Sequence, residues 1–192
     1  MSRLDSLRFF ISRQEKIMQT VKYHIKSLSP FLFHNVNSMD LVKPADMTHA
    51  EFESSEEMFR GRLYLEGDKL ILPPRVIIGA LKVASQKSGI KQPGKRATFA
   101  NVIRAITFVL DPGEFSQTIE DVVEHKEYVT VQRSKVLRVF PMLKEWDVKF
   151  TLHFDPKQIS KDAIESILKY CGSYVGLGDY RPQHGRFTVE EI

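Results

Sequence analysis

Residues 146–170 read WDVKFTLHFDPKQISKDAIESILKY, and this stretch determines which kind of fold the chain can form. In residues 146–154 apolar and polar side chains alternate, which is the pattern of a β-strand with one buried face. Asp155 and Pro156 end this strand, because proline has no N–H with which to continue a ladder. Ser160 then provides a helix N-cap, and apolar residues follow at helical spacing. The stretch therefore predicts a strand followed directly by an amphipathic helix.

A glycine-rich stretch, residues 171–187 (CGSYVGLGDYRPQHGRF), follows the helix and leads into a last alternating run at residues 186–192. Glycine gives the backbone freedom where side chains would block the close approach of a ligand. The stretch also contains two arginines, two tyrosines and a histidine, which are residue types that bind phosphates and stack on bases. The structural alternative is a helix C-cap at Gly172 and a loop that turns the chain into a strand. The stretch alone does not decide between these interpretations.

The other segments complete a pattern of alternating strands and helices. We predict an amphipathic helix at residues 2–20, a strand at 21–33, a helix at 49–58, a hairpin at 59–72, a helix at 74–88, an apolar β-rich run at 103–110 and an extended arm at 128–139. The order contains βαββαβ, the ferredoxin-like or RRM-like pattern. We therefore predict an α+β fold, with a four-stranded antiparallel sheet and two core helices. One domain is expected over residues 1–192, with its core in residues 20–33, 74–110 and 145–192 and insertions at residues 34–72 and 111–144.

The composition excludes several classes of protein. Hydrophobic residues make up 42% of the chain, and no apolar run approaches the roughly 18 residues of a membrane span. The first residues match neither a signal peptide nor a lipidation site. Cys171 is the only cysteine, so no internal disulfide can form, and the scattered histidines show no zinc spacing. We expect a protein of the cytoplasm, in a prokaryote or a bacterial host cell, with no membrane partner and no metal or other cofactor.

Basic residues are segregated along the chain, although the formal net charge is only +4. Residues 69–110 contain eight lysines and arginines and no acidic residue, and residues 128–144 contain basic charges only. Acidic residues gather in residues 46–57 and 111–127. Such segregation is typical of a surface that binds a polyanion. The alternative is that solvated helix faces collect lysines by chance.

Short motifs of this chain resemble a known protein family. Residues 70–82 (LILPPRVIIGALK) are similar to the hairpin, proline and apolar Gly-Ala-Leu-Lys helix of the RAMP superfamily of CRISPR-associated proteins, especially its Cas7-like backbone subunits. Residues 172–186 resemble the glycine-rich loop that those proteins place after their second core helix. Residues 138–146 (RVFPMLKEW) and 176–182 (GLGDYRP) are most similar in appearance to RAMP-like proteins of bacteriophages. The resemblance is dispersed over residues 20–192.

This resemblance implies an RRM-like fold that binds single-stranded RNA without cleaving it, with subunits that form a homo-oligomer along the strand. Single-stranded DNA is the other ligand consistent with the sequence, because contacts to a 2′-hydroxyl leave no mark in the composition. The chain departs from backbone subunits of the family in its short length. It also shows no evident long thumb with aromatic tips.

Two further functions are consistent with the sequence. One is a Cas6-like, metal-free endoribonuclease, in which the resemblance implies a histidine as general base; His184, beside Arg181 and Arg186, is the candidate. A loop histidine that only binds phosphate or solvent is the simpler explanation, so we do not expect an enzyme. The other is a structural, assembly or host-interference protein of a phage, whose sheet edges and N-terminal helix build a homo-oligomer.

The residues predicted to bind nucleic acid come from three segments. They are the basic loop after the first core helix, the extended arm, and the glycine stretch, whose arginines present guanidinium groups to phosphate. Tyr180 is expected to stack on a base, whereas Tyr174, just after a helix, is more easily explained by core packing. The full set is Lys91, Lys95, Arg96, Arg133, Lys135, Arg138, Gly176, Gly178, Tyr180, Arg181, His184 and Arg186.

Overall fold

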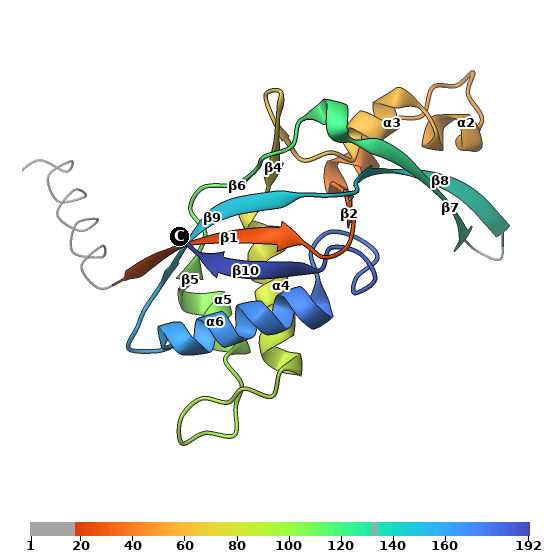
Figure 1. The fold of residues 1–192 in the computed structure, drawn as a ribbon. Helices are drawn as coiled ribbons and strands as arrows, with labels where there is room; N and C mark the ends of the chain where they lie inside the picture. The colour runs from red at the N-terminus through yellow and green to blue at the C-terminus, as the bar shows by residue number, and fades with distance from the viewer. Residues whose placement is uncertain (1–17, 132–133) are drawn as a thin grey trace, which may run out of the picture.

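The computed structural model describes residues 18–131 and 134–192, and Figure 1 shows their arrangement. The helix predicted at residues 2–20 lies outside the described residues except for its last three positions, where strand β1 begins. Arg133 of the predicted binding set also lies outside them. Within the two described ranges, no helix is long and apolar enough to cross a membrane.

The main sheet has seven strands in the order β10-β1-β9-β6-β4-β3, with β5 also paired to β9. These strands are β1 (Gln19–Ser27), β3 (Leu65–Glu66), β4 (Lys69–Leu72), β5 (Thr107–Phe108), β6 (Gly113–Phe115), β9 (Asp147–Phe154) and β10 (Phe187–Glu191). All of their pairings are antiparallel. Helices α4 (Pro74–Lys87) and α6 (Lys161–Tyr170) connect successive core strands, in the ferredoxin-like manner. The predicted α+β class is therefore confirmed, with β4 and β3 extending the sheet.

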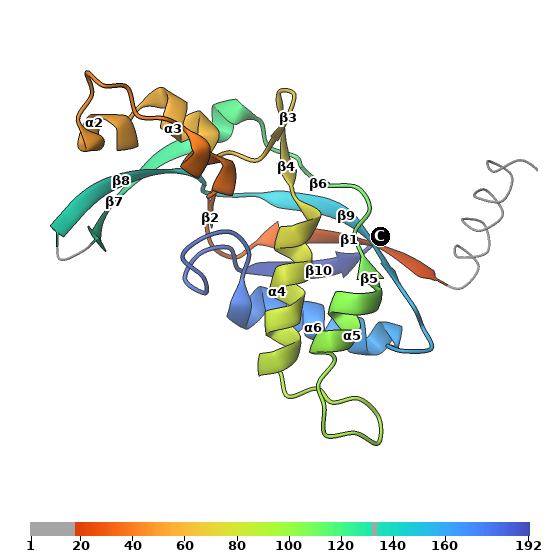
Figure 2. The ribbon, with the colours of Figure 1, turned by 180° about the vertical axis from the view of Figure 1, so that it is seen from behind.

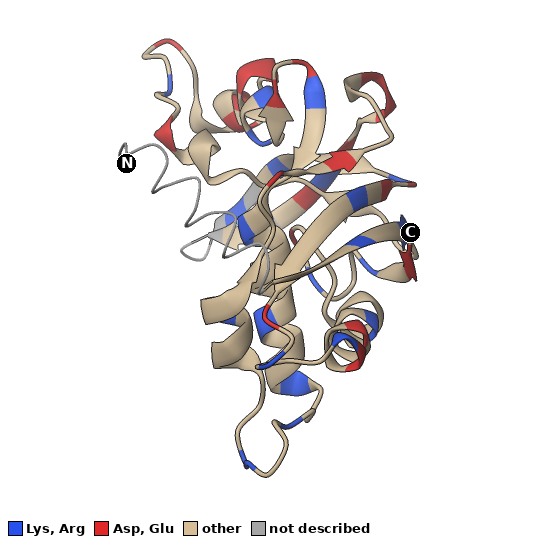
Figure 3. Ribbon diagram, turned by 90° about the vertical axis from the view of Figure 1, so that its left-hand side faces the viewer, with Lys and Arg blue, Asp and Glu red and all other residues tan. Residues whose placement is uncertain are grey.

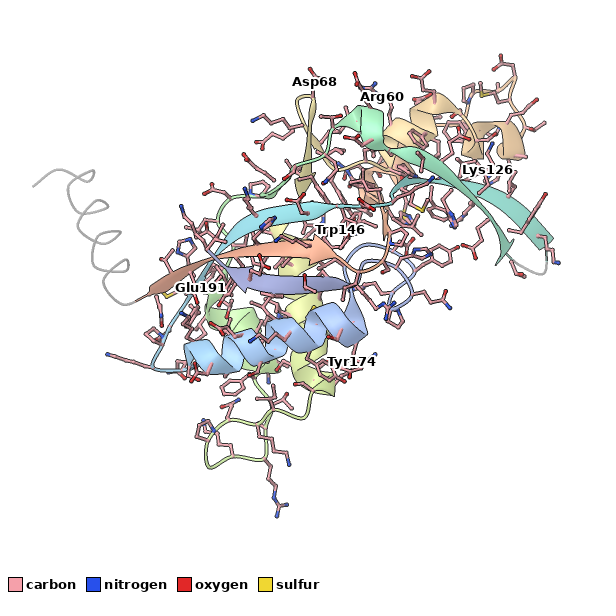
Figure 4. All side chains as sticks on the ribbon, in the orientation of Figure 1. Arg60, Asp68, Lys126, Trp146, Tyr174 and Glu191 are labelled. Carbon is pink, nitrogen blue, oxygen red and sulfur yellow. The ribbon has the colours of Figure 1, made fainter. Side chains whose placement is uncertain are left out.

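The core lies between this sheet and the helices α4, α5 (Ala100–Ile106) and α6, which cover one face of the sheet (Figure 2). Alternate residues of the neighbouring strands β1 and β9 point toward the helices, as the alternation in residues 146–154 predicts. Ser160 caps α6, because its hydroxyl accepts a hydrogen bond from the Ala163 N–H at 3.3 Å. Trp146, labelled in Figure 4, is 2% exposed, and its indole N–H donates to the Ser29 carbonyl at 2.9 Å.

The apolar run predicted as β-rich at residues 103–110 is helical up to Ile106, so this prediction is wrong for its first half. Residues 100, 103 and 106 lie on the side of α5 that packs toward the core, with Ala100 and Ile103 buried. An apolar run of this length fits a buried helix as well as a strand, and packing of α5 against α4 selects the helix. Only the two residues of β5 remain as strand.

Residues 34–64 form an insertion above one end of the main sheet (Figure 1). It contains the 3₁₀ helix η1 (Val36–Asp40) and the short helices α2 (His49–Glu53) and α3 (Glu56–Gly61). The single helix predicted at residues 49–58 is therefore two helices. The chain breaks between them because Ser55 caps α3 by accepting a hydrogen bond from the Met58 N–H at 3.2 Å.

A long hairpin of β7 (Val123–Val131) and β8 (Ser134–Leu143) projects beyond the body of the protein, as Figures 1 and 2 both show. It follows the short 3₁₀ helix η2 (Ile119–Asp121) and forms a second sheet with β2 (Phe31–Leu32). The extended arm predicted at residues 128–139 is this hairpin. The chain therefore has a long projection, although the sequence shows no evident long thumb with aromatic tips; Tyr128 of the projecting strand is 68% exposed.

Candidate nucleic-acid interface

The glycine loop, residues 176–186, is attached to the chain segment that joins β1 to β2. It follows a π-helical turn at the end of α6, η3 (Cys171–Val175). The Gly185 N–H donates to the Pro30 carbonyl at 2.7 Å, and the Asp179 N–H donates to the carbonyl of Leu32 at 3.1 Å. The loop is therefore held by hydrogen bonds to a separate part of the chain, and its side chains have defined positions.

Gly176 and Gly178 serve the packing of this loop itself. Both have left-handed backbone angles, with φ of +76° and +77°. A Cβ atom at Gly176 would lie 2.6 Å from the His184 carbonyl oxygen, and one at Gly178 would lie 2.6 Å from the Leu32 carbonyl oxygen. Only glycine fits these positions, whether or not a ligand approaches the loop. The prediction that both glycines bind nucleic acid is not needed to explain them.

His34 and Asp179 form a hydrogen-bonded pair where the glycine loop meets the insertion. Nδ1 of His34 donates to Oδ2 of Asp179 at 2.7 Å, and the Tyr64 hydroxyl donates to the His34 carbonyl at 2.9 Å. The hydrogen bond from His34 lowers the pKa of Asp179 below its ordinary value, against the opposing effect of burial. The hydrogen bond from the Tyr180 N–H and the electrostatic effects of His34 and Arg181 lower this pKa further. The carboxylate is therefore ionised, and it orients the imidazole ring.

Three adjoining hollows lie beside the His34–Asp179 pair. The loop hollow, of about 340 Å³, lies between α4 and the glycine loop and is lined by Val83, Lys87, Tyr174, Val175, Asp179, Tyr180, Arg181 and Pro182. The central hollow, of about 240 Å³, is lined by His34, Val36, Met39, Tyr64, Gly178 and Asp179. The insertion hollow, of about 390 Å³, lies between the insertion and β8. Asp179 borders the first two hollows, and His34 and Met39 border the last two, so neighbouring hollows share lining residues and we refer to the three as a row.

Basic side chains stand at both ends of this row. Lys87 and Arg181 are exposed and line the loop hollow, whereas Lys43 and Arg138 line the insertion hollow. Near the central hollow, Arg75 stacks over the Tyr64 ring, with its guanidinium carbon 5.7 Å from the ring centre. Cations placed along a groove in this way can follow the phosphates of a single strand.

The predicted binding residues do not all come together. Tyr180 and Arg181 line the loop hollow and Arg138 lines the insertion hollow, while Lys135 is exposed on the projecting hairpin and Arg186 is exposed just before β10. The basic loop of Lys91, Lys95 and Arg96 projects at the opposite side of the body from the hairpin (Figures 1 and 2). Figure 3 shows the same loop as an isolated basic tip at the bottom of the molecule. This loop is not part of the row of hollows.

The two tyrosines of the glycine stretch exchange the roles that the sequence suggests. Tyr174 is 65% exposed beside the end of α6 (Figure 4), so the expectation of core packing is wrong for it. Its ring lies 4.9 Å from that of Tyr170, centre to centre. Tyr180 is half-buried and meets the Phe140 ring edge-on at 5.3 Å. Tyr174 is therefore the ring available for stacking, whereas Tyr180 joins the glycine loop to the hairpin.

His184, a residue of the glycine loop, packs against the hairpin. Its ring centre lies 5.7 Å from that of His125 and 6.4 Å from that of Tyr180, and Nδ1 is buried without a hydrogen-bond partner among the described residues. Burial lowers the pKa of His184, and the neighbouring His125 lowers it further, against smaller opposing effects of Glu127 and Asp179. The imidazole is therefore neutral near pH 7, and it lines none of the three hollows.

Sequence reasoning missed several residues of this interface, including Lys87, His34 and Tyr174. Lys87 is one of eight bases in residues 69–110, and nothing in the sequence distinguishes it from the others. His34 follows a strand and carries no periodic signal, although the polar residues after a strand end often reach a site. Tyr174 follows a helix and carries no signal of its own, and only the structure, in which it is 65% exposed, distinguishes stacking from core packing.

Comparisons with known proteins add little to this description. A scan against models of known families finds no match, and a search of curated proteins finds no relative. Among solved structures, the chain is similar to one from the cryo-EM structure of the Type III-B Cmr-beta bound to cognate target RNA. The match has 14% identity and a TM-score of 0.43, and it covers 100% of this chain and 68% of the other. A likeness at this level assigns neither a family nor a function.

Proposed function

We propose that this protein binds single-stranded nucleic acid, preferably RNA, along the row of three hollows and does not cleave it. The observation that carries the proposal is the row itself, which has basic side chains at both ends and the exposed Tyr174 ring at one of them. A flexible strand needs cations for its phosphates and flat rings for its bases, and this row offers both. Such contacts recognise backbone and stacking, so binding would be weakly sequence-specific and strongly dependent on salt.

The preference for RNA rests on the sequence resemblance of residues 70–82 and 172–186 to RNA-binding RAMP proteins. The test is fluorescence anisotropy with labelled single-stranded RNA, single-stranded DNA and duplex across a salt series. Strands of about 30 nucleotides are long enough, because one small domain covers roughly 4–16 nucleotides. Tightest binding to RNA, falling steeply with salt, is the expected result. Equal binding to DNA would remove the preference for RNA, and no binding to any strand at low salt would overturn the proposal.

We propose further that several copies assemble along one strand in the cytoplasm of a prokaryotic cell. Exposed apolar side chains outside the three hollows support this arrangement: Val42 in the insertion, and Phe108 and Leu110 near β5. The insertion and β5 are separate parts of the molecule (Figure 1), and two different surfaces that meet head to tail produce an open array. Light scattering on complexes with strands of increasing length tests this. The mass should rise in steps of one protein, and a constant mass would contradict assembly.

A metal-free endoribonuclease is the second candidate, and the observation that favours it is the His34–Asp179 pair rather than His184. A carboxylate that holds Nδ1 of an imidazole leaves the other ring nitrogen available as a general base. Incubation of labelled RNA with the purified protein in a chelator tests this activity. Cleavage that is lost in His34→Ala would establish an enzyme, whereas intact RNA after prolonged incubation supports binding alone.

A further inference from the structure

The insertion hollow differs from the other two in its apolar floor. Its volume of about 390 Å³ is within the range of small-molecule sites. Four apolar side chains contribute to its lining: Met39, Leu41, Phe52 and Met58. The floor is fixed, because Phe52 and Met58 are each 5% exposed, whereas Met39 at the rim is 72% exposed. A flat apolar ring can lie on such a floor, and flexible methionine side chains adapt to its shape.

The charged groups beside this floor are unbalanced. The Glu53 carboxylate is shared by two arginines: Nη2 of Arg62 lies 2.5 Å from Oε2, and Nε of Arg138 lies 3.7 Å from the same oxygen. The Glu53 and Arg62 side chains are 10% and 4% exposed, so one carboxylate faces two guanidinium groups in a largely buried place. Apart from Glu53, no carboxylate of the described residues lies within 4 Å of either guanidinium group, and Glu127 is opposite Arg138 in the β7–β8 ladder. A site of this kind favours an anion.

Arg138 is the side chain positioned to bind that anion. The Arg62 guanidinium is already engaged, since it donates to the carbonyl oxygens of Glu53 and Val139 as well as to the Glu53 carboxylate. Nε of Arg138 is buried with no hydrogen-bond partner in residues 18–131 and 134–192, and the side chain is 33% exposed at the hollow. A buried donor without an acceptor is costly. An anionic group that entered the hollow would supply the acceptor.

A second cation stands at the mouth of the hollow. The Lys43 ammonium donates to the carbonyl oxygens of Pro44 at 2.9 Å and Met47 at 2.6 Å, which fixes its position at the surface. His49 lines the same hollow. The apolar floor, together with the cationic side chains of Arg138 and Lys43, matches a molecule that has a flat ring at one end and an anion at the other.

We propose that the insertion hollow binds one nucleotide, with its base on the apolar floor and its phosphate between Arg138 and Lys43. This inference rests on the proposed function, and it adds to it a site that holds a single nucleotide. The nucleotide is either free or one unit of a bound strand, since both present the same ring and phosphate. In a strand, this unit leaves the stack of its neighbours and enters the hollow next to the His34–Asp179 pair, which borders the central hollow.

The experiment is an NMR titration of the full chain with uridine and adenosine 5′-monophosphates, the corresponding nucleosides, and inorganic phosphate. We expect the monophosphates to shift signals of Met39, Phe52, Met58 and Arg138, and to bind more tightly than nucleoside or phosphate alone. Arg138→Gln should weaken monophosphate binding about tenfold, as expected for one hydrogen bond to a charged group. The matched control is Arg60→Gln, on the outer helix α3 (Figure 4), which removes an exposed arginine and should leave affinity unchanged.

A second variant keeps the test decisive if Arg138→Gln does not fold. Met39→Glu changes a side chain that is 72% exposed, so the fold should survive, and it places a carboxylate at the rim that repels the phosphate. Equal affinity for phosphate and for monophosphates would overturn the proposal, because the base then contributes nothing. Strand binding by anisotropy, with no shift at the hollow from either the strand or the monophosphates, would overturn it as well, while the proposed function would stand. An unlabelled strand that shifts the same signals would identify the strand as the source of the nucleotide.

Discussion

Two loops of this protein contain both basic residues and glycine, yet they are built in different ways. The glycine loop is bonded to Pro30, in the segment between β1 and β2, and to Leu32 of β2. The loop at residues 88–99 is bonded mainly to itself, for example through the Gln92 N–H, which donates to the Ala97 carbonyl at 2.9 Å. The first loop therefore presents its side chains at fixed positions beside a row of hollows, and the second projects into solvent. Basic composition alone does not make a binding surface; a fixed geometry is also needed.

The largest expected effect is on stability, when one glycine in each loop is replaced by alanine. Gly185 and Gly94 both have left-handed φ angles, of +74° and +68°. A Cβ at Gly185 would lie 1.7 Å from the Leu177 carbonyl oxygen, whereas a Cβ at Gly94 meets nothing within 4 Å. We expect Gly185→Ala to lower the free energy of unfolding by about 2–4 kcal/mol. Gly94→Ala should lower it by only about 1 kcal/mol, from the backbone angle alone. Urea unfolding measures both, and equal losses would show that the glycine loop is no more constrained than the other.

A smaller effect, on binding, is expected when the exposed ring of Tyr174, in the turn before the glycine loop, is removed. Tyr174→Ala should weaken single-strand binding by about 1–3 kcal/mol, the value of one stacked base. Its stability should hardly change, because the side chain is 65% exposed. Tyr128→Ala, at a 68% exposed position on the hairpin, is the matched control and should bind as the unmodified protein does. Anisotropy titrations compare them, and equal weakening in both variants would place the strand on the hairpin instead.

The His34–Asp179 pair beside the glycine loop should make the free energy of unfolding depend on pH. The pKa of Asp179 is lowered in the folded protein, first by the hydrogen bond from His34. The stability from this carboxylate is therefore present above its unfolded pKa of about 3.9 and is lost as the pH falls through the folded value. Asp179→Asn should lose about 1 kcal/mol at neutral pH, a modest figure because the carboxylate is 35% exposed. The difference from the unmodified protein should shrink below about pH 4; a constant difference would contradict the pair.

The smallest effect concerns His184, which packs between the loop and the hairpin. Burial and His125 lower its pKa below the unfolded value of about 6.5. The folded state therefore favours the neutral ring, and the stability it contributes is present above about pH 6.5 and is lost as the pH falls toward the folded value. Thermal unfolding between about pH 7 and pH 5 should show a weaker pH dependence in His184→Gln than in the unmodified protein. Identical profiles would mean that this imidazole is not buried against His125.

Much of the fold was predictable because its core elements carry strong local signals. The alternation in residues 146–154 and the cap at Ser160 each indicate one structure, and the observed β9 and α6 agree with them. The run at residues 103–110 was not predictable in the same way, since a short apolar stretch fits a buried helix and a buried strand equally. Its contact with α4, a tertiary interaction, decides for the helix.

The candidate site was less predictable, because it depends on which segments meet in space. Lys87 and Lys91 are four residues apart in one basic region, but only Lys87 lines a hollow. The hydrogen-bond partner of His34 is Asp179, which is 145 positions away in the sequence. Exposed lysines and loop histidines have the same sequence pattern whether or not they face a groove, so only the packing of the glycine loop on the β1–β2 segment identifies them.

The most direct test of this account compares two double variants that each remove two positive charges. Lys87→Gln with Arg181→Gln changes the loop hollow, and Lys95→Gln with Arg96→Gln changes the projecting loop. In anisotropy titrations with single-stranded RNA at fixed salt, we expect the first pair to weaken binding about tenfold or more and to reduce the slope against salt by about two charges. The second pair should change affinity less than about twofold. Equal losses in both pairs would contradict the account, because binding would then follow net charge and not the row of hollows.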